Sequence, residues 1–203
     1  MVIYHYIRNY IRTGIQFLNH NTNDFNWFKL CKDFFNNTHG IFLCFSYAPP
    51  KNSTYSKMID YNILELVEKD IPKYSHQGKI IIAGDLNART ANENDYIVHD
   101  TSKHIPVSPN YISDFAPVDR VSQDRNINNR GKQLRSLCIE SGLRLLNGRS
   151  TGDLLGSFTC HQPLGSSVVD YIAVSVDMLP LFHISKYISI VLNCQTIVKC
   201  HVY

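Results

Sequence analysis

The sequence predicts a layered α/β domain, because short apolar runs typical of β-strands alternate with two segments of helical periodicity. Its 203 residues, 44% hydrophobic and 18% charged, suit a globular domain with a substantial core. No repeat, low-complexity tract or Pro/Gly-rich linker divides the chain. We therefore expect one domain over residues 1–203.

The first elements follow from apolar patterning. The runs at 25–30 and 41–47 are short, apolar and aromatic, and they predict two strands. Between 56 and 77, apolar residues recur with a helical period. They predict a helix whose regular part ends early at Pro72, with Gly78 as the C-cap.

A continuous β-branched run at 79–84 predicts a strand buried on both faces, which delivers Asp85 to its end. A second helix is expected over 131–141, capped by Asn128 or Asn129 and burying one apolar stripe. The remaining expected elements are strands at 143–146, 157–160 and 168–174, and a long, mobile surface loop at 91–119.

The charge of the chain is small overall, at +3, but it is unevenly distributed. Residues 120–149 carry a net charge of +5. This segment is either a basic face that attracts phosphate-rich substrates or a solvated surface with chance clustering. Its charged residues are Arg120, Arg125, Arg130, Lys132, Arg135, Arg144 and Arg149, opposed by Asp124 and Glu140.

The six cysteines form no C-x-x-C pair, and we expect them to be reduced thiols, mostly in the core. Cys194, Cys200 and His201 lack the second ligand pair of a zinc site. Residues 1–15 are interrupted by polar and charged residues, which excludes a signal peptide, and no run is long enough to span a membrane. These features favour an intracellular protein, in the nucleus or the cytoplasm.

The most informative motif is the sequence Gly84-Asp85-Leu86-Asn87 at the end of the predicted buried strand. An aspartate there can hold or deprotonate a water, and an asparagine can donate to a phosphoryl oxygen without adding repulsive charge. Gly84 leaves room for a ligand to approach. The alternative is a simple turn, since aspartate and asparagine both favour turns after strands.

Two further motifs place polar groups in apolar surroundings. Asp170 interrupts the β-rich run at 168–174, so it needs a histidine, arginine or backbone donor as its partner. Tyr47 precedes two prolines that stop its strand. Its hydroxyl either contacts a ligand or lies in the core.

Five motifs occur in the order found in the endonuclease domains of non-LTR (LINE-type) retrotransposons, and the chain resembles these domains from about residue 25 to about residue 175. The motifs are Tyr47-Ala48-Pro49-Pro50, Gly84-Asp85-Leu86-Asn87-Ala88-Arg89, Asn128-Asn129-Arg130-Gly131, Leu145-Leu146-Asn147-Gly148-Arg149 and Ser166-Ser167-Val168-Val169-Asp170-Tyr171. These domains belong to the exonuclease–endonuclease–phosphatase superfamily, which includes deoxyribonuclease I. The resemblance implies two mixed β-sheets flanked by helices, and Mg²⁺-assisted cleavage of DNA phosphodiester bonds. Together with the apolar runs, the order of the motifs predicts that 79–84 and 168–174 are neighbouring core strands that bring Asp85 and Asp170 to one rim.

The resemblance also implies roles for individual residues. Tyr47 matches a tyrosine that contacts the scissile phosphate, and Asp85 matches the aspartate that activates the attacking water. Asn87 matches the asparagine that orients water and phosphate, and Asp170 matches the partner of a catalytic histidine. Arg130 and Arg149 are candidate substrate contacts.

Parts of the family pattern are missing. The first glutamate of the chain is Glu65, after the tyrosine motif, and Ser-Asp-His does not occur. We therefore expect an incomplete domain with a divergent tail at 190–203, and an impaired or absent Mg²⁺ site and activity. The alternatives are a non-catalytic mobile-element remnant that binds nucleic acid or a partner, and a phosphatase of the same superfamily.

Overall fold

The computed structural model describes residues 7–18, 22–97 and 119–184. Most of the expected 91–119 loop and the 190–203 tail, with Cys194, Cys200 and His201, lie outside these residues. The elements, in chain order, are η1 (Asn9–Gly14), β1 (Ile15–Leu18), β2 (Phe25–Leu30), α1 (Lys32–Phe35), β3 (Gly40–Ser46), α2 (Thr54–Met58), α3 (Ile63–Ser75), β4 (Gly78–Asp85), α4 (Asn129–Glu140), β5 (Leu143–Leu145), β6 (Cys160–Gln162), β7 (Gly165–Ser167), β8 (Asp170–Ser175), η2 (Val176–Met178) and α5 (Leu179–Ile184).

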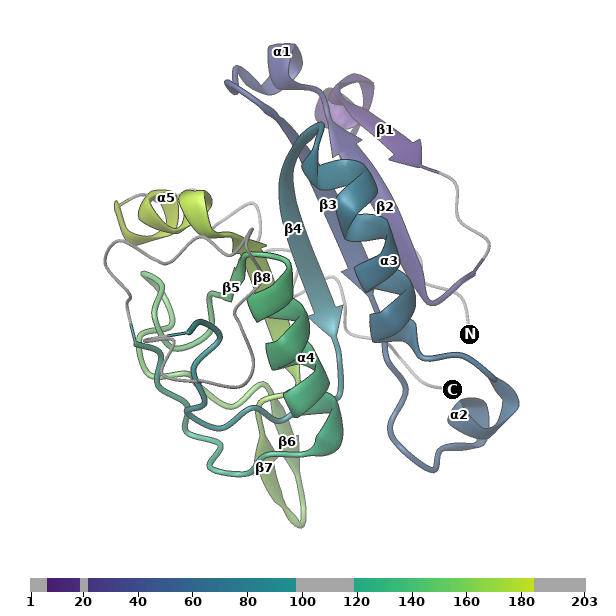
Figure 1. The fold of residues 1–203 in the computed structure, drawn as a ribbon, viewed down its shortest axis with the longest axis vertical. Coiled ribbons are helices and arrows are strands. Elements are labelled where there is room, and N and C mark those ends of the chain that lie inside the picture. Colours follow the sequence, from purple (N-terminus) through teal and green to yellow (C-terminus); the bar gives the residue numbers. More distant parts are fainter. Residues whose placement is uncertain (1–6, 19–21, 98–118, 185–203) are drawn as a thin grey trace, which may run out of the picture.

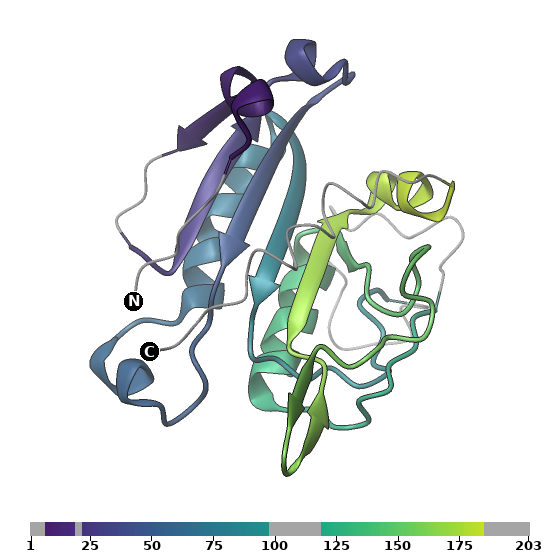
Figure 2. The ribbon, with the colours of Figure 1, turned by 180° about the vertical axis from the view of Figure 1, so that it is seen from behind.

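The fold is mixed α/β, as the sequence predicts. Six strands form one sheet in the order β1-β2-β3-β4-β8-β5, in which β3 and β4 are parallel and the other neighbours are antiparallel. Helices α3 and α4 lie side by side against one face of this sheet (Figure 1). The second sheet among the described residues is the antiparallel pair β6–β7, which projects beyond the large sheet (Figure 2).

Two apolar clusters hold the layers together. The larger cluster packs α3 and α4 onto the sheet, and Trp27, Phe42 and Tyr74 form a stacked aromatic group within it. The smaller cluster lies on the opposite face, where Ile81 and Phe182 join the chain after β8 to the centre of the sheet. The strands β4 and β8 are therefore apolar on both faces, as expected for a strand at the centre of layered structure.

The helix expected over 56–77 is divided into two, α2 and α3. Asn62 caps the second helix, because its side chain accepts a hydrogen bond from the backbone N–H of Leu64 (3.1 Å). The expectation that Pro72 ends the helix was wrong, since α3 continues to Ser75. Ile71 and Tyr74 are buried on either side of Pro72, and their packing holds the last turn although one backbone bond is lost.

Gly78 is also not a helix cap: it is the first residue of β4. A Cβ atom at this position would lie 2.2 Å from the backbone oxygen of Gly40, so the close approach of two strands requires glycine. The cysteines Cys31, Cys44, Cys138 and Cys160 are free thiols, as expected. Within the described part of the chain, no helix is both long enough and apolar enough to cross a membrane.

The start of helix α4 is capped by a side chain that accepts a hydrogen bond from a backbone N–H of the first turn. The Asn128 side chain accepts a hydrogen bond from the backbone N–H of Gly131 at 2.7 Å, which identifies Asn128 as the N-cap. Gly131 packs against the backbone of Arg89, and a Cβ atom there would lie 1.9 Å from the Arg89 oxygen. The start of α4 is thus pressed against the loop that follows β4.

Gly131→Ala should destabilise the protein by about 1–3 kcal/mol, the usual cost of forcing extra atoms into a packed site. Alanine normally stabilises a helix relative to glycine by about 1 kcal/mol, so the sign of the effect is diagnostic. Chemical denaturation of Gly131→Ala and of the exposed neighbour variant Lys132→Ala measures it. Equal or greater stability of Gly131→Ala would show that the backbone contact is not required.

Candidate functional site

Two carboxylates face each other at one end of the central strand pair. Strands β4 and β8 are antiparallel, and their register pairs Asp85 with Asp170. The sequence predicted that the segments 79–84 and 168–174 are neighbouring core strands that bring both residues to one rim, and the pairing confirms this. The two side chains are partly buried and share a site where β4 ends and β8 begins.

Gly84 does not leave room for a ligand, which corrects the sequence interpretation. A Cβ atom at Gly84 would lie 1.8 Å from the backbone oxygen of Ser46, and the residue has a φ of 152°. The space beside it is filled by the end of β3, where Ala48 N–H donates to the backbone oxygen of Asp85 at 2.8 Å. Gly84 therefore allows the Tyr47 segment to lie against Asp85.

Asn87 turns back onto Asp85. Its φ of 46° places it in the left-handed region, where asparagine is tolerated better than most residues. Its backbone N–H donates to Asp85 Oδ1 at 3.0 Å, and its Nδ2 donates to Asp85 Oδ1 and to the Ala48 oxygen, both at 2.9 Å. Both amide protons are engaged, so the group that Asn87 can offer to a ligand here is Oδ1, an acceptor of water protons or a metal ligand.

Arg130 supplies a cation to the same site. Its Nη1 donates to the Pro49 oxygen at 2.7 Å, directly after the Tyr47-Ala48 pair. Burial lowers the pKa of this arginine, while the negative charges of Asp85 and of ionised Tyr47 raise it. Arg130 therefore lies near both groups. Tyr47 itself is 6% exposed, so its side chain lies largely in the interior.

Asp170 is held by two polar residues that the sequence reasoning did not assign to it. The Thr159 hydroxyl oxygen accepts from the backbone N–H groups of Val169 (3.0 Å) and Asp170 (3.1 Å), and the hydroxyl bonds to the Asp170 carboxylate. Asn147 Nδ2 donates to the Asp170 backbone oxygen at 3.0 Å. A hydroxyl is thus the carboxylate's partner, rather than the histidine, arginine or backbone donor expected.

The loop after β4 is held by charged and polar bonds to the segment before α4. Arg89 makes a bidentate ion pair with Asp124, with both nitrogen–oxygen distances at 2.7 Å. Asn128 also accepts from Arg89 N–H (3.1 Å) and donates to the Asn87 oxygen (3.2 Å). These bonds fix the loop that carries Asn87.

The electrostatics of the site favour proton uptake. Burial and, to a smaller extent, the facing Asp170 carboxylate raise the pKa of Asp85 to about 7. The Asn87 backbone N–H and the Arg130 guanidinium oppose this shift. Burial also raises the pKa of Asp170, against the bond from Thr159. A carboxylate with a pKa near neutrality is suited to general acid–base catalysis.

Arg149 lies elsewhere, which corrects the expectation of a substrate contact. It is 2% exposed, and its Nη2 donates to Asp95, a fully buried carboxylate, at 2.7 Å. Arg120 and Arg144 are buried as well, so three of the seven cations in the basic segment 120–149 belong to the interior. This segment is therefore neither a continuous basic face nor simply a solvated surface.

The donor set fits Mg²⁺ in part. Mg²⁺ commonly uses one or two carboxylates and keeps several waters or substrate oxygens, and Asp85 and Asp170 can provide that minimum. A cation there would also relieve the repulsion that raises the pKa of Asp85. Among the residues that the structure describes, no group of three or more His, Cys, Asp or Glu side chains could hold a metal. The described residues therefore offer a cation two carboxylates here, Asp85 and Asp170.

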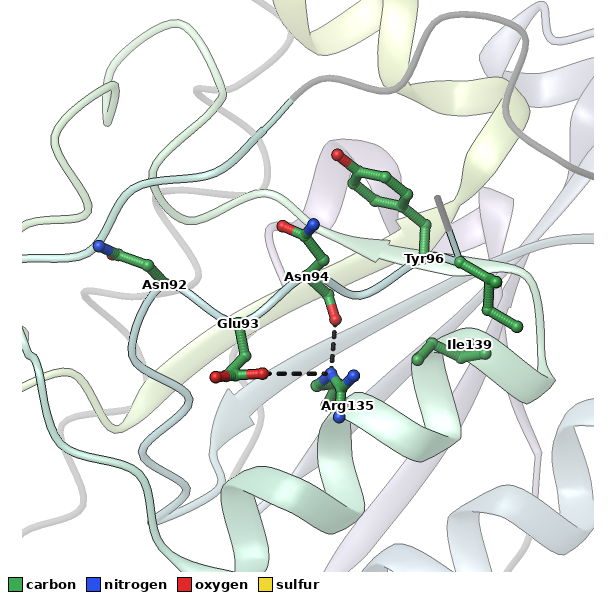
Figure 3. A pocket seen from close by; sticks show the side chains of 7 residues that line it. Asn92, Glu93, Asn94, Tyr96, Arg135 and Ile139 are labelled. Atoms are coloured by element: carbon green, nitrogen blue, oxygen red, sulfur yellow. Dashed lines mark hydrogen bonds and ion pairs between the residues drawn. The ribbon is translucent and has the colours of Figure 1, made fainter. Parts of the chain in front are cut away.

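A separate hollow of about 410 Å³ lies beside α4 (Figure 3). Arg135 enters it, but its Nε donates to the Asn94 oxygen at 2.6 Å and lies 4.0 Å from Glu93. The other lining residues are Asn92, Tyr96, Ile97 and Ile139. None of the sequence-predicted site residues lines this hollow, so the candidate site remains the carboxylate pair.

No protein family and no curated protein matches the sequence. Among solved structures, the chain is similar to a 3′-5′ exonuclease (NExo) from Neisseria meningitidis, with 10% sequence identity and a TM-score of 0.49. The similarity covers 82% of this chain and 59% of that one. The chain therefore spans less than two thirds of the length of that protein.

Asp170→Asn should lower the pKa of Asp85 from about 7, because it removes the facing negative charge. The pKa should remain above the ordinary value of 3.8, because burial is the larger cause of the shift. Carboxyl ¹³C NMR titrations of the wild type and of this variant measure the change. An unchanged Asp85 titration would mean that the two carboxylates do not interact.

The raised pKa also predicts how stability depends on pH. The folded state holds the Asp85 proton more tightly than the unfolded state, so the resulting stabilisation is complete below about 3.8 and is lost as the pH rises through about 7. Relative to Asp85→Asn, which cannot ionise, the wild type should therefore lose stability across that window. Urea unfolding at stepped pH values measures the difference, and a constant difference would contradict the pKa shift.

Proposed function

We propose that this domain hydrolyses phosphodiester bonds in DNA with the help of Mg²⁺, at a rate well below that of an enzyme with a complete ligand set. The observation that carries the proposal is the pairing of Asp85 with Asp170, next to Asn87, Arg130 and Tyr47. The order of the five motifs, which resembles that of LINE-type endonuclease domains, supports the same class of reaction.

Asp85 is the proposed general base. Its pKa of about 7 in the absence of a cation would fall when a cation binds, so Asp85 would be ionised at neutral pH and could accept a proton from an attacking water. Asn87 is fixed beside it by two Nδ2 bonds, and its Oδ1 can accept a hydrogen bond from the same water. The water would thereby be oriented by two acceptors from residues that are two apart in sequence and are joined by the Asn87 Nδ2 bond to Asp85 Oδ1 (2.9 Å).

Arg130 and Tyr47 are the proposed phosphate contacts. The Arg130 guanidinium uses one Nη1 bond to hold Pro49, and its other N–H groups suit a phosphoryl oxygen. The Tyr47 contact rests on the family resemblance, since a phenol hydroxyl can donate a hydrogen bond to a phosphate. Asp170 would share a cation with Asp85, and a bound Mg²⁺ would polarise the phosphoryl group and stabilise the leaving oxygen.

The expected low rate follows from the donor set. The chain contains neither Ser-Asp-His nor a glutamate before the tyrosine motif, and the described residues hold no third metal-binding side chain near the pair. A positioned acid–base group typically contributes a factor of about 10²–10⁴ to the rate. The rate losses caused by a missing acid–base group and by a weakly held ion need not multiply, because the effects of residues that act as a unit are non-additive.

The purified chain should nick supercoiled plasmid slowly and only with millimolar Mg²⁺, because the cation supplies the charge that polarises the phosphoryl group. Asp85→Ala and Asn87→Ala should each reduce nicking by about 10²-fold or more, because each removes a group that positions or deprotonates the water. Gel quantification of the nicked circle measures the rate.

Asp33→Asn is the matched control, since it removes an exposed carboxylate that precedes the site strands and should not alter nicking. Nicking that survives Asp85→Ala, or that is absent at every Mg²⁺ concentration, would contradict the proposed hydrolysis. Nicking at a rate typical of efficient nucleases would instead contradict the expected impairment.

A further inference from the structure

A fully buried carboxylate, that of Asp24, lies outside the candidate site. Asp24 directly precedes β2 and is 0% exposed. Its Oδ1 accepts a hydrogen bond from the Tyr55 hydroxyl at 2.6 Å, and its Oδ2 accepts one from the Tyr61 hydroxyl. Among the described residues, no cation forms an ion pair with it. A buried carboxylate is costly without partners, so these two phenols are required to keep it in place.

The contacts of Asp24 hold a long connecting segment at three points. Its backbone oxygen accepts from the Tyr47 N–H at 2.8 Å, where the segment leaves β3. Tyr55 lies in α2, in the middle of the segment, and Tyr61 lies at its end, just before the cap of α3. One residue therefore holds the beginning, the middle and the end of residues 47–61.

Residues 48 and 49 of this segment form hydrogen bonds with residues of the candidate site. Ala48 N–H donates to the Asp85 oxygen (2.8 Å), and the Ala48 oxygen accepts from Asn87 Nδ2 (2.9 Å). The next residue, Pro49, accepts from Arg130 (2.7 Å). A displacement of the segment would therefore be transmitted directly to the base, the water-orienting amide and the cation of the site.

The two phenol groups that donate to Asp24 have raised pKa values. Burial, followed by the hydrogen bond to Asp24, raises the pKa of Tyr61 to about 12, and the same causes raise the pKa of Tyr55. Both phenols therefore keep the protons that they donate at neutral pH. The three-point attachment does not depend on titration of the site itself.

We propose that Asp24 is a positioning residue for the phosphodiester-cleaving site, acting through residues 47–49 on Asn87 and Arg130. This inference rests on the function proposed above. Asp24 touches neither substrate nor metal in this account. Its loss should therefore change the rate of the chemical step more than the binding of DNA.

The test compares three variants of the full chain. Asp24→Asn replaces one acceptor oxygen by an amino group, which cannot accept from a tyrosine hydroxyl. Tyr61→Phe removes one of the two donors and is the milder change, used if Asp24→Asn does not fold. Asp70→Asn is the control, because it weakens a different polar bond, the one from Trp27 Nε1 in β2 to Asp70 in α3 (3.1 Å).

Two readouts are needed, together with the unfolding midpoint of each variant. The first is the NMR signal of the Asn87 side-chain amide, which reports its bonds to Ala48 and Asp85. The second is the division of the nicking effect between kcat and KM. Asp24→Asn should shift the Asn87 signal and lower kcat by about 10- to 100-fold, as expected for a misplacement of about 1 Å, with KM changed by less than about twofold. Asp70→Asn should reduce stability without either change.

The outcomes separate this inference from the proposed function. If the wild type does not nick DNA, the proposed function fails, and an unmoved Asn87 signal in folded Asp24→Asn or Tyr61→Phe would overturn the positioning role independently. If the wild type nicks DNA, unchanged kcat in the folded variant overturns the inference. An equal loss of kcat in Asp70→Asn would also overturn it, because the effect would then follow general destabilisation.

Discussion

The register between β4 and β8 is the constraint on which the candidate site depends. It places Asp85 opposite Asp170, so two like charges lie side by side, partly buried, at the ends of two central strands. Such a pair is unfavourable unless protons, hydrogen-bond donors or a cation compensate it. The donors found around it, from Asn87 and Thr159, compensate it only in part, since the pKa of Asp85 remains at about 7. Burial and, to a smaller extent, the residual repulsion give the site its affinity for protons, and the repulsion would also favour a bound cation.

The motif residues divide into those that face this pair and those that hold it. Gly84 and Gly131 are glycines because backbone oxygens occupy the positions of their Cβ atoms. Asn128 joins the β4 loop to α4, and Asn147 holds the backbone of Asp170. A sequence motif around an active site can therefore be mostly scaffold, and Arg149, whose guanidinium pairs with a buried aspartate, belongs to that scaffold.

Local patterns were sufficient to predict the α/β class, the buried strand ending at Asp85 and the stripe of α4, because apolar periodicity and caps are short-range signals. The paired carboxylates were also predicted, with the family order of motifs as the guide. Thr159 could not be, because its contact with Asp170 arises from the packing of a hairpin whose strands are three residues long. The burial of Arg120, Arg144 and Arg149 was missed for a related reason: a charge in the sequence gives no sign of its tertiary partner.

The most direct test of the account is where a divalent cation binds. Mn²⁺, as a paramagnetic substitute for Mg²⁺, broadens the NMR signals of nearby nuclei, and it can be titrated into the ¹⁵N- and ¹³C-labelled chain at neutral pH. The account predicts that the carboxyl signals of Asp85 and Asp170 broaden together and first, with the Asn87 amide next, and that Asp170→Asn weakens the effect. Broadening that begins at other acidic residues, or that affects Asp85 without Asp170, would contradict a shared cation site and the function built on it.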